Sequence, residues 1–235
     1  PPDDDCVVME TPAFQRSTVT AAYEGAPPFD TATTRGFFFV TPVGKWMTPK
    51  QKEELLRENY DAEQADTVVH ETYPGHHLQI SLSRRHPSLI RKAMGTSLFS
   101  EGWGLYVEEL SNELGYYSDE ERLVELDWTL VRAARVIIDV GLHTKGMTPE
   151  QAVALLTDKV HLEKTLAWSE VKRYTATPTQ PLSYLIGREK IFALREEFKK
   201  RDPEHFTLKR FHDDFLSHGE MPLKLVALEM GLAGK

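Results

Sequence analysis

Helix start signals recur along most of the chain, and they constrain its fold more than any other feature. Thr48-Pro49-Lys50-Gln51 places an N-cap threonine, a proline at the first helical position and a glutamine three residues after the cap. Thr148-Pro149-Glu150-Gln151 repeats this pattern, and Ser118-Asp119-Glu120-Glu121 is a third capping box. We expect a mainly α fold with helices over 49–60, 62–82, 87–112, 118–142, 149–157, 160–172, 181–200, 204–218 and 221–231, interrupted locally at Pro74-Gly75, Pro87 and Gly102.

The first 47 residues lack these signals and are expected to be irregular or extended. Gly25-Ala26-Pro27-Pro28 breaks any helix, and the aromatic and β-branched run from Gly36 to Val40 predicts one strand. We therefore divide the chain into an extended segment, 1–47, and a helical part, 48–235, which together form one domain. The start at Pro1, with neither methionine nor signal-peptide pattern, favours a fragment or a processed chain and leaves the compartment open.

The composition excludes several classes of protein. The chain has 28 Lys+Arg and 36 Asp+Glu, and the resulting net charge of −8 argues against non-specific nucleic-acid binding. No run approaches the roughly 18 apolar residues of a membrane span. The single cysteine, Cys6, excludes an internal disulfide framework and a cysteine-rich zinc site. Any zinc would therefore be bound by histidine and carboxylate.

The side chains best suited to metal binding and catalysis are concentrated in one segment, which contains His70, Glu71, His76 and His77. Zinc hydrolases often place two histidines and a general-base glutamate on one helix, with the histidines four residues apart. In a regular helix, seven residues return His77 to within about 20° of the face of His70, whereas six leave His76 about 120° away. Pro74-Gly75 disfavours a regular helix, and a two-residue bulge there would restore the phase for His76. We prefer His76 as a metal ligand and keep His77 as the alternative.

A third protein ligand is expected downstream, because catalytic zinc sites commonly have three protein ligands. Glu101 lies in apolar surroundings 31 positions after the first histidine, beside Gly102 and Gly104, which permit close backbone approach. Glu108 and Glu109 are competitors, and a solvated helix face explains them better. Glu108 could instead accept the second ring N–H of a ligating histidine.

A polar stripe crosses the otherwise apolar helix predicted over 118–142. Its members, Arg132, Arg135, Asp139 and His143, follow steps of 3, 4 and 4 and so share one face. One interpretation is a solvated outer face. The other is a cleft wall, with Arg135 paired to Asp139 and His143 pointing at the reacting centre.

The segment from Glu170 to Gly187 is broken by two prolines and contains Arg173, Gln180 and Tyr184. A tyrosine hydroxyl suits an oxyanion, and an arginine suits a substrate carboxylate. From spacing alone, a connector between helices is the simpler interpretation.

These segments together resemble the bacterial domain of unknown function 885 family, whose members are proposed to be zinc metallopeptidases of the His-Glu-zincin superfamily. The resemblance lies in the stretches 70–79, 100–106, 135–143 and 173–187, and it extends from about Tyr23 to the end. It implies a zincin-like fold and the C-terminal, metal-bearing part of a longer chain. The family signature resembles His-Glu-x-x-Pro-Gly-His, which supports His76 over His77.

A looser likeness links Gly75-His76-His77-Leu78, Ser100-Glu101 and the Pro178–Gly187 stretch to the thermostable carboxypeptidase family. It implies Glu101 as a ligand and Tyr184 as a transition-state donor. The departure is a two-residue lengthening between Glu71 and His76. The superfamily analogy also implies that the strand Phe37–Val40 is a sheet edge for an extended peptide.

The expected function is therefore a zinc-dependent peptidase. The expected roles are zinc ligation by His70, His76 and Glu101, proton transfer by Glu71, oxyanion stabilisation by Tyr184 or His143, and substrate contacts from Arg173, Gln180 and Phe38. Two alternatives remain open: a zinc amidase or esterase acting on a small metabolite, and a metal-binding protein without turnover. The oligomeric state and the compartment are undetermined.

Overall fold

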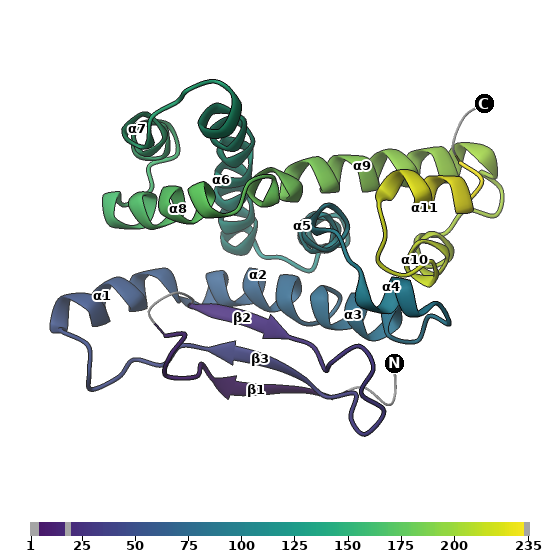
Figure 1. Cartoon of the computed structure of the whole chain (residues 1–235), viewed down its shortest axis with the longest axis horizontal. Helices are drawn as coiled ribbons and strands as arrows, with labels where there is room; N and C mark the ends of the chain where they lie inside the picture. Colours follow the sequence, from purple (N-terminus) through teal and green to yellow (C-terminus); the bar gives the residue numbers. More distant parts are fainter. Residues whose placement is uncertain (1–4, 17–19, 233–235) are drawn as a thin grey trace.

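The computed structural model describes residues 5–16 and 20–232, and most of this part is helical (Figure 1). The helices are α1 (Pro49–Glu58), α2 (Asp61–Glu71), α3 (His76–Ser83), α4 (Leu89–Ala93), α5 (Ser97–Glu113), α6 (Asp119–Thr144), α7 (Pro149–Lys159), α8 (Lys164–Ala176), α9 (Gln180–Arg201), α10 (Leu208–Ser217) and α11 (Leu223–Glu229). The expected mainly helical fold with a small β element near the N-terminus is confirmed. Within the described ranges, no helix is both long enough and apolar enough to cross a bilayer.

Three helix starts follow the predicted capping chemistry. Thr48, Ser118 and Thr148 each accept a hydrogen bond from the backbone N–H three residues on, and each completes a capping box. The predicted helix over 87–112 is wrong, because α4 ends at Ala93 and α5 begins after the extended cap Thr96. The Thr96 N–H donates to a distant carboxylate on residue 220, an interaction that local sequence does not reveal.

The N-terminal segment contains a three-stranded sheet instead of the single strand predicted. Its strands are β1 (Cys6–Glu10), β2 (Ala21–Glu24) and β3 (Gly36–Val40), in the order β1-β3-β2. Strand β3 pairs in parallel with β1 and antiparallel with β2, so it is the central strand and the expected sheet edge at Phe37–Val40 is wrong. Residues 1–4 and 17–19 of the predicted extended segment lie outside the described residues.

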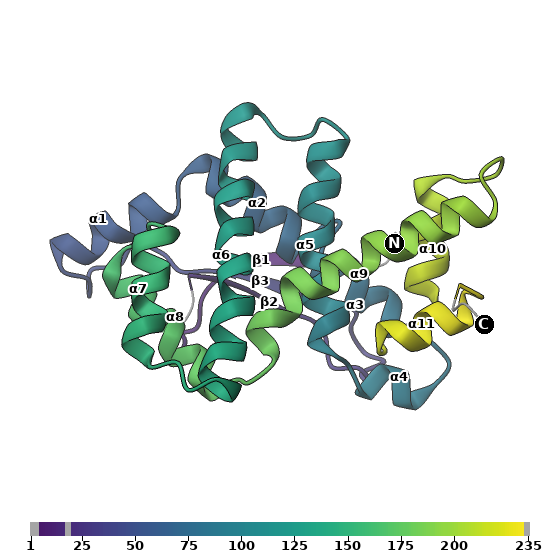
Figure 2. The same cartoon turned by 90° about the horizontal axis from the view of Figure 1, so that it is seen from above.

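The helices stack above this sheet in layers (Figure 1). Helices α2 and α3 lie next to the sheet, α5 lies above them, and α9 crosses α5 on the far side, as the view from above also shows (Figure 2). Gly102 and Gly187 meet where α5 and α9 cross, because a Cβ on Gly102 would lie 2.6 Å from the Gly187 Cα. Buried aromatic side chains from α5, α9 and α10, including Trp103, Phe198 and Phe215, fill the adjacent core. This packing holds α5 against α2 and α3, which supply the histidines.

Candidate metal centre

The chain breaks its helix between the two histidines of the motif. Helix α2 ends at Glu71, a turn follows, and α3 begins at His76, so the single predicted helix over 62–82 is two helices. Gly75 is required in the turn, because a Cβ there would lie 1.8 Å from the His70 carbonyl oxygen. The Trp103 indole N–H donates to the Pro74 carbonyl at 2.9 Å and ties the turn to α5.

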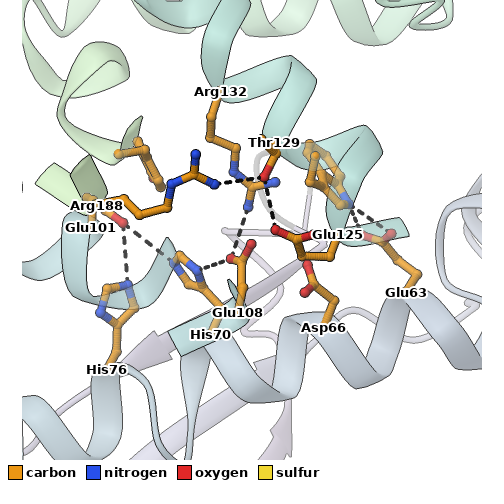
Figure 3. A network of polar contacts seen from close by, with 12 residues as sticks. Glu63, Asp66, His70, His76, Glu101, Glu108, Glu125, Thr129, Arg132 and Arg188 are labelled. Carbon is orange, nitrogen blue, oxygen red and sulfur yellow. Dashed lines mark hydrogen bonds and ion pairs between the residues drawn. The ribbon is translucent and has the colours of Figure 1, made fainter. Parts of the chain in front are cut away.

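The turn brings His76 to His70, and α5 brings Glu101 to both. The two imidazole rings are 4.7 Å apart and perpendicular. The Glu101 Oε2 lies 3.6 Å from the His70 Nε2 and 3.4 Å from the His76 Nε2 (Figure 3). Gly104 allows this approach, since a Cβ there would lie 2.4 Å from the His70 Cε1. One donor atom from each of the three side chains falls within 4.8 Å of the others, which is the grouping that the sequence predicted.

His77, the alternative ligand, is directed elsewhere. Its side chain is fully buried, its Nδ1 is hydrogen-bonded to the Tyr23 hydroxyl, and its Nε2 to the Tyr73 hydroxyl, both at 2.8 Å. Both ring nitrogens are therefore engaged. His77 connects α3 to strand β2 and to the turn, and it is not part of the three-residue grouping.

Glu108 orients His70 from the opposite side of its ring. The His70 Nδ1–H donates to the Glu108 Oε1 at 2.5 Å, which leaves Nε2 facing Glu101 (Figure 3). Burial raises the pKa of Glu108, but the positive charge of Arg132, 3.5 Å away, and the bond to His70 outweigh it and hold this pKa below its usual value. Glu108 is therefore a carboxylate, in the outer-partner role that sequence reasoning had suggested for it.

The electrostatics of the site favour a cation. Burial alone would lower the pKa of His70, yet the ion pair with Glu101 and the hydrogen bond to Glu108 raise it to about 10. Burial would likewise raise the pKa of Glu101, and the ion pairs with the two histidines hold it well below its usual range. The carboxylates of Glu101 and Glu108 thus keep the imidazole of His70 protonated between them. A metal ion bound to the Nε2 atoms would take the place of that proton.

Replacing Glu108 with glutamine is expected to weaken zinc binding by about 10–100-fold, the usual cost of losing an outer-shell partner. The amide is nearly isosteric with the carboxylate, but it lacks the negative charge that orients and polarises His70. Competition with a fluorescent zinc chelator measures the affinity. An unchanged affinity in a folded variant would show that the bond from His70 to Glu108 has no part in metal binding.

Gln180 and Arg173 hold the other oxygen of Glu101. The Arg173 guanidinium donates to the Gln180 Oε1 at 2.9 Å, which directs the Gln180 amide N–H group to the Glu101 Oε1 at 3.2 Å. The Glu101 Oε2 is thereby left facing the histidines. Arg173 and Gln180 thus position Glu101, and the substrate contacts expected of them stay a prediction.

Tyr184 lies beside the grouping, as the sequence predicted. Its ring stacks on His70 with centroids 6.2 Å apart, and its hydroxyl accepts a hydrogen bond from Gln180 at 3.1 Å. Burial and the nearby carboxylate of Glu101 raise the pKa of Tyr184 far above its usual value. The hydroxyl therefore keeps its proton at neutral pH and is able to donate it in a hydrogen bond.

Glu71 and Phe38 are placed very differently. Glu71 is the last residue of α2, directly after His70 and half-buried; among the described residues its carboxylate forms no hydrogen bond or ion pair. Phe38 lies in the central strand, and only 2% of it is exposed. Phe38 therefore supports the core of the sheet and does not face a substrate.

The predicted polar stripe on α6 braces neighbouring helices. Arg135 pairs with Glu170 of α8 at 2.9 Å, so the expected pairing with Asp139 is wrong. Asp139 instead accepts the backbone N–H of Thr179 before α9. His143 lies in the last turn of α6, where its Nε2 is bonded to the carbonyl of Tyr174 in α8, and it does not join the metal grouping. Asp139 and His143 thus bond backbone groups at the start of α9 and near the end of α8, which spacing alone does not reveal.

Some neighbours of the site were not anticipated from the sequence. Glu220, in the loop between α10 and α11, accepts hydrogen bonds from the Gln79 side chain at 3.3 Å and from the Thr96 N–H at 2.9 Å. Burial raises the pKa of Glu220, and the charges of Glu101 and His76 also act on that pKa in opposite directions. No motif marks Glu220, because its partners lie more than a hundred residues earlier in the chain. Tyr23, 54 residues before His77, and Tyr73, in the turn four residues before it, both bond to His77 and were also not anticipated.

Known proteins resemble the chain in sequence and in structure. A family model described as bacterial protein of unknown function (DUF885) matches residues 1–230. A "putative lipoprotein of unknown function" from Shewanella oneidensis is 33% identical with a TM-score of 0.84, covering 96% of this chain and 40% of that one. A "putative lipoprotein" from Colwellia psychrerythraea is 28% identical with a TM-score of 0.84, covering 97% and 37%. The chain thus spans about two fifths of these relatives. No curated protein matches it.

Proposed function

The chain belongs to the DUF885 family of bacterial proteins of unknown function, and from the chemistry of its site we propose that it is a zinc-dependent peptidase. His70, His76 and Glu101 would hold the metal. We also propose that the helical fold is zincin-like, with α2 and α3 in the role of the metal-binding helix. One observation supports this most strongly: two imidazoles and one carboxylate converge, and a second carboxylate orients one imidazole.

The three proposed ligands suit zinc, and their number is more typical of a catalytic zinc site than of a structural one. Structural zinc sites are closed by four protein ligands, whereas catalytic sites commonly have three, such as two histidines and a glutamate. In the part of the chain that the structure describes, the grouping contains three residues. Both ring nitrogens of His77 are hydrogen-bonded to tyrosine hydroxyls, so His77 does not add a fourth ligand. When bound, zinc would act as a Lewis acid, polarising the scissile carbonyl and making water a better nucleophile near neutral pH.

The remaining steps fall to side chains of this protein. Glu71 follows His70 directly, and its free carboxylate would take the proton of the attacking water and pass it to the leaving amine. Tyr184 would donate its hydroxyl proton in a hydrogen bond to the developing oxyanion. Gln180 orients both Glu101 and Tyr184 through its single amide group. Arg173 keeps that amide in the required orientation.

The sheet supports a peptide as the substrate. Strand β2 is bonded to β3 along one side, and in the described ranges its other side pairs with no strand. It lies next to α2 and α3 (Figure 1), and Tyr23 of β2 is bonded to His77, the neighbour of His76. An extended peptide pairing with β2 would lie along this edge near the metal grouping. In this proposal β2, and not the Phe37–Val40 strand that the superfamily analogy implies, is the edge that would receive the peptide.

Metal removal tests the proposed function. Purified protein incubated with 1,10-phenanthroline is expected to lose cleavage of a mixed peptide library, and one equivalent of zinc is expected to restore it. Mass spectrometry of the products identifies the cleaved bonds. Zinc-loaded, folded protein that cleaves no peptide but hydrolyses amides or esters of small metabolites would overturn the peptide assignment. Binding of zinc without any turnover would overturn catalysis altogether.

A further inference from the structure

Helix α6 carries an apolar stripe on the side opposite to its buried polar residues. Leu123, Leu126, Leu130 and Ile137 are exposed to between 45% and 62%, although the same helix buries Arg132 and Arg135. Ala133 and Val140 are half-buried and complete the series. Single exposed leucines are ordinary on protein surfaces, but a continuous row along one helix marks an interaction surface.

The spacing of the row is that of a coiled-coil seam. Successive members are separated by 3, 4, 3, 4 and 3 residues, which is the a/d pattern of the heptad repeat. The six positions extend over about 26 Å of helix at 1.5 Å per residue. A partner that fits this surface is therefore itself an amphipathic helix.

From the register and charge of this surface we infer that its partner is a second copy of the chain, paired through antiparallel α6 helices. In an antiparallel pair the row complements itself: Leu123 lies opposite the partner's Val140, Leu126 opposite the partner's Ile137, and Leu130 opposite the partner's Ala133. Every large side chain meets an apolar residue. The small Ala133 next to the two-fold axis leaves room for the leucine of the other helix.

The charges at the ends of α6 favour the same orientation. Asp119 and Glu120 are exposed in its first turn, and Lys145 is exposed directly after its last turn. Antiparallel pairing places the acidic start of one helix beside the basic end of the other. Parallel pairing would place like charges together at both ends. The contact is isologous, so it closes as a dimer.

Sedimentation velocity of the purified protein over about 1–100 μM tests the dimer, and a Leu130→Asp variant tests the surface. A dimer is expected, and the substitution is expected to raise its dissociation constant at least about 100-fold, because the symmetric contact loses two central leucines and buries two carboxylates. Leu228→Asp on α11 is the matched control, since Leu228 is also an exposed helical leucine. It should leave the dimer unchanged, and circular dichroism should show both variants folded.

The register is tested by cross-linking in a Cys6→Ser background. The double variant Leu130→Cys/Ala133→Cys is expected to form a disulfide-linked dimer, whereas Leu123→Cys/Leu126→Cys is not, because neither of these residues faces itself or the other. A protein that stays monomeric over the whole range, whether the row is bare or covered by further sequence of a longer chain, overturns the inference. A dimer that tolerates Leu130→Asp, or that fails to cross-link at 130 and 133, overturns it as well.

Discussion

Replacing His76 with alanine is expected to remove zinc from the protein, whereas replacing His77 with phenylalanine is expected to leave it bound. The His76 Nε2 faces Glu101 at 3.4 Å, while both nitrogens of His77 are bonded to tyrosine hydroxyls. Loss of a ligand should weaken zinc binding more than the 10–100-fold typical of an outer-shell partner, that is, by at least about 100-fold. Metal analysis after dialysis against a weak chelator measures the retained zinc.

The two variants control each other, because they alter adjacent residues of the same helix. His77 is fully buried, so His77→Phe keeps an aromatic ring in the space, and thermal unfolding must show that both variants fold. The opposite result, zinc retained by His76→Ala and lost from folded His77→Phe, would contradict the assignment of ligands. Loss of zinc from both would mean that the metal depends on the integrity of α3 and not on one ring.

Replacing Glu71 with glutamine is expected to abolish most turnover while zinc binding persists. General acid–base groups typically contribute about 10²–10⁴-fold to a rate, so the turnover number should fall within that range. The amide has nearly the shape of the carboxylate but accepts no proton at neutral pH. Because Glu71 is not in the three-residue metal grouping, the zinc content should remain near one per chain.

Glu54→Gln is the matched control for this substitution. Glu54 is a half-buried glutamate on α1, paired with Lys50, and is outside the site. The control variant should keep full activity. Turnover retained by Glu71→Gln would exclude Glu71 as the general base, and loss of its zinc would show instead that the Glu71 charge is needed to hold the metal.

Local signals were sufficient to predict the mainly helical fold, three helix starts and the metal grouping, but not the division of 62–82 and 87–112 into separate helices. The capping boxes at Thr48, Ser118 and Thr148 lie within four residues of the helix starts they define. His70 and His76 are separated only by a short turn, and the proline and glycine in that turn indicate the break. Glu101 was recognisable because a carboxylate is unusual in an apolar segment flanked by glycines. Chemistry confined to a few neighbouring residues is visible in the sequence.

Roles that depend on distant partners were not predictable in this way. The phase of a regular helix favoured His77 over His76 as the metal ligand. In the structure the His77 ring is instead bonded to Tyr23, which is 54 residues away in the sequence. Arg173 and Gln180 have the right chemistry for a substrate carboxylate, but their contacts with Glu170 and Glu101 are not visible in the sequence. Strands β1 and β2 are short, and only pairing with β3 distinguishes them from loops. In each case tertiary packing selects the partner.

The central claim is that His70, His76 and Glu101 hold one zinc ion with a coordination position left open. Anomalous diffraction at the zinc edge, from crystals grown with zinc, tests it most directly. We predict a single peak bounded by the Nε2 atoms of His70 and His76 and by a Glu101 oxygen, at about 2.0–2.2 Å, with no fourth protein ligand. Absence of a peak between these side chains, or a fourth protein ligand that closes the site, would contradict it.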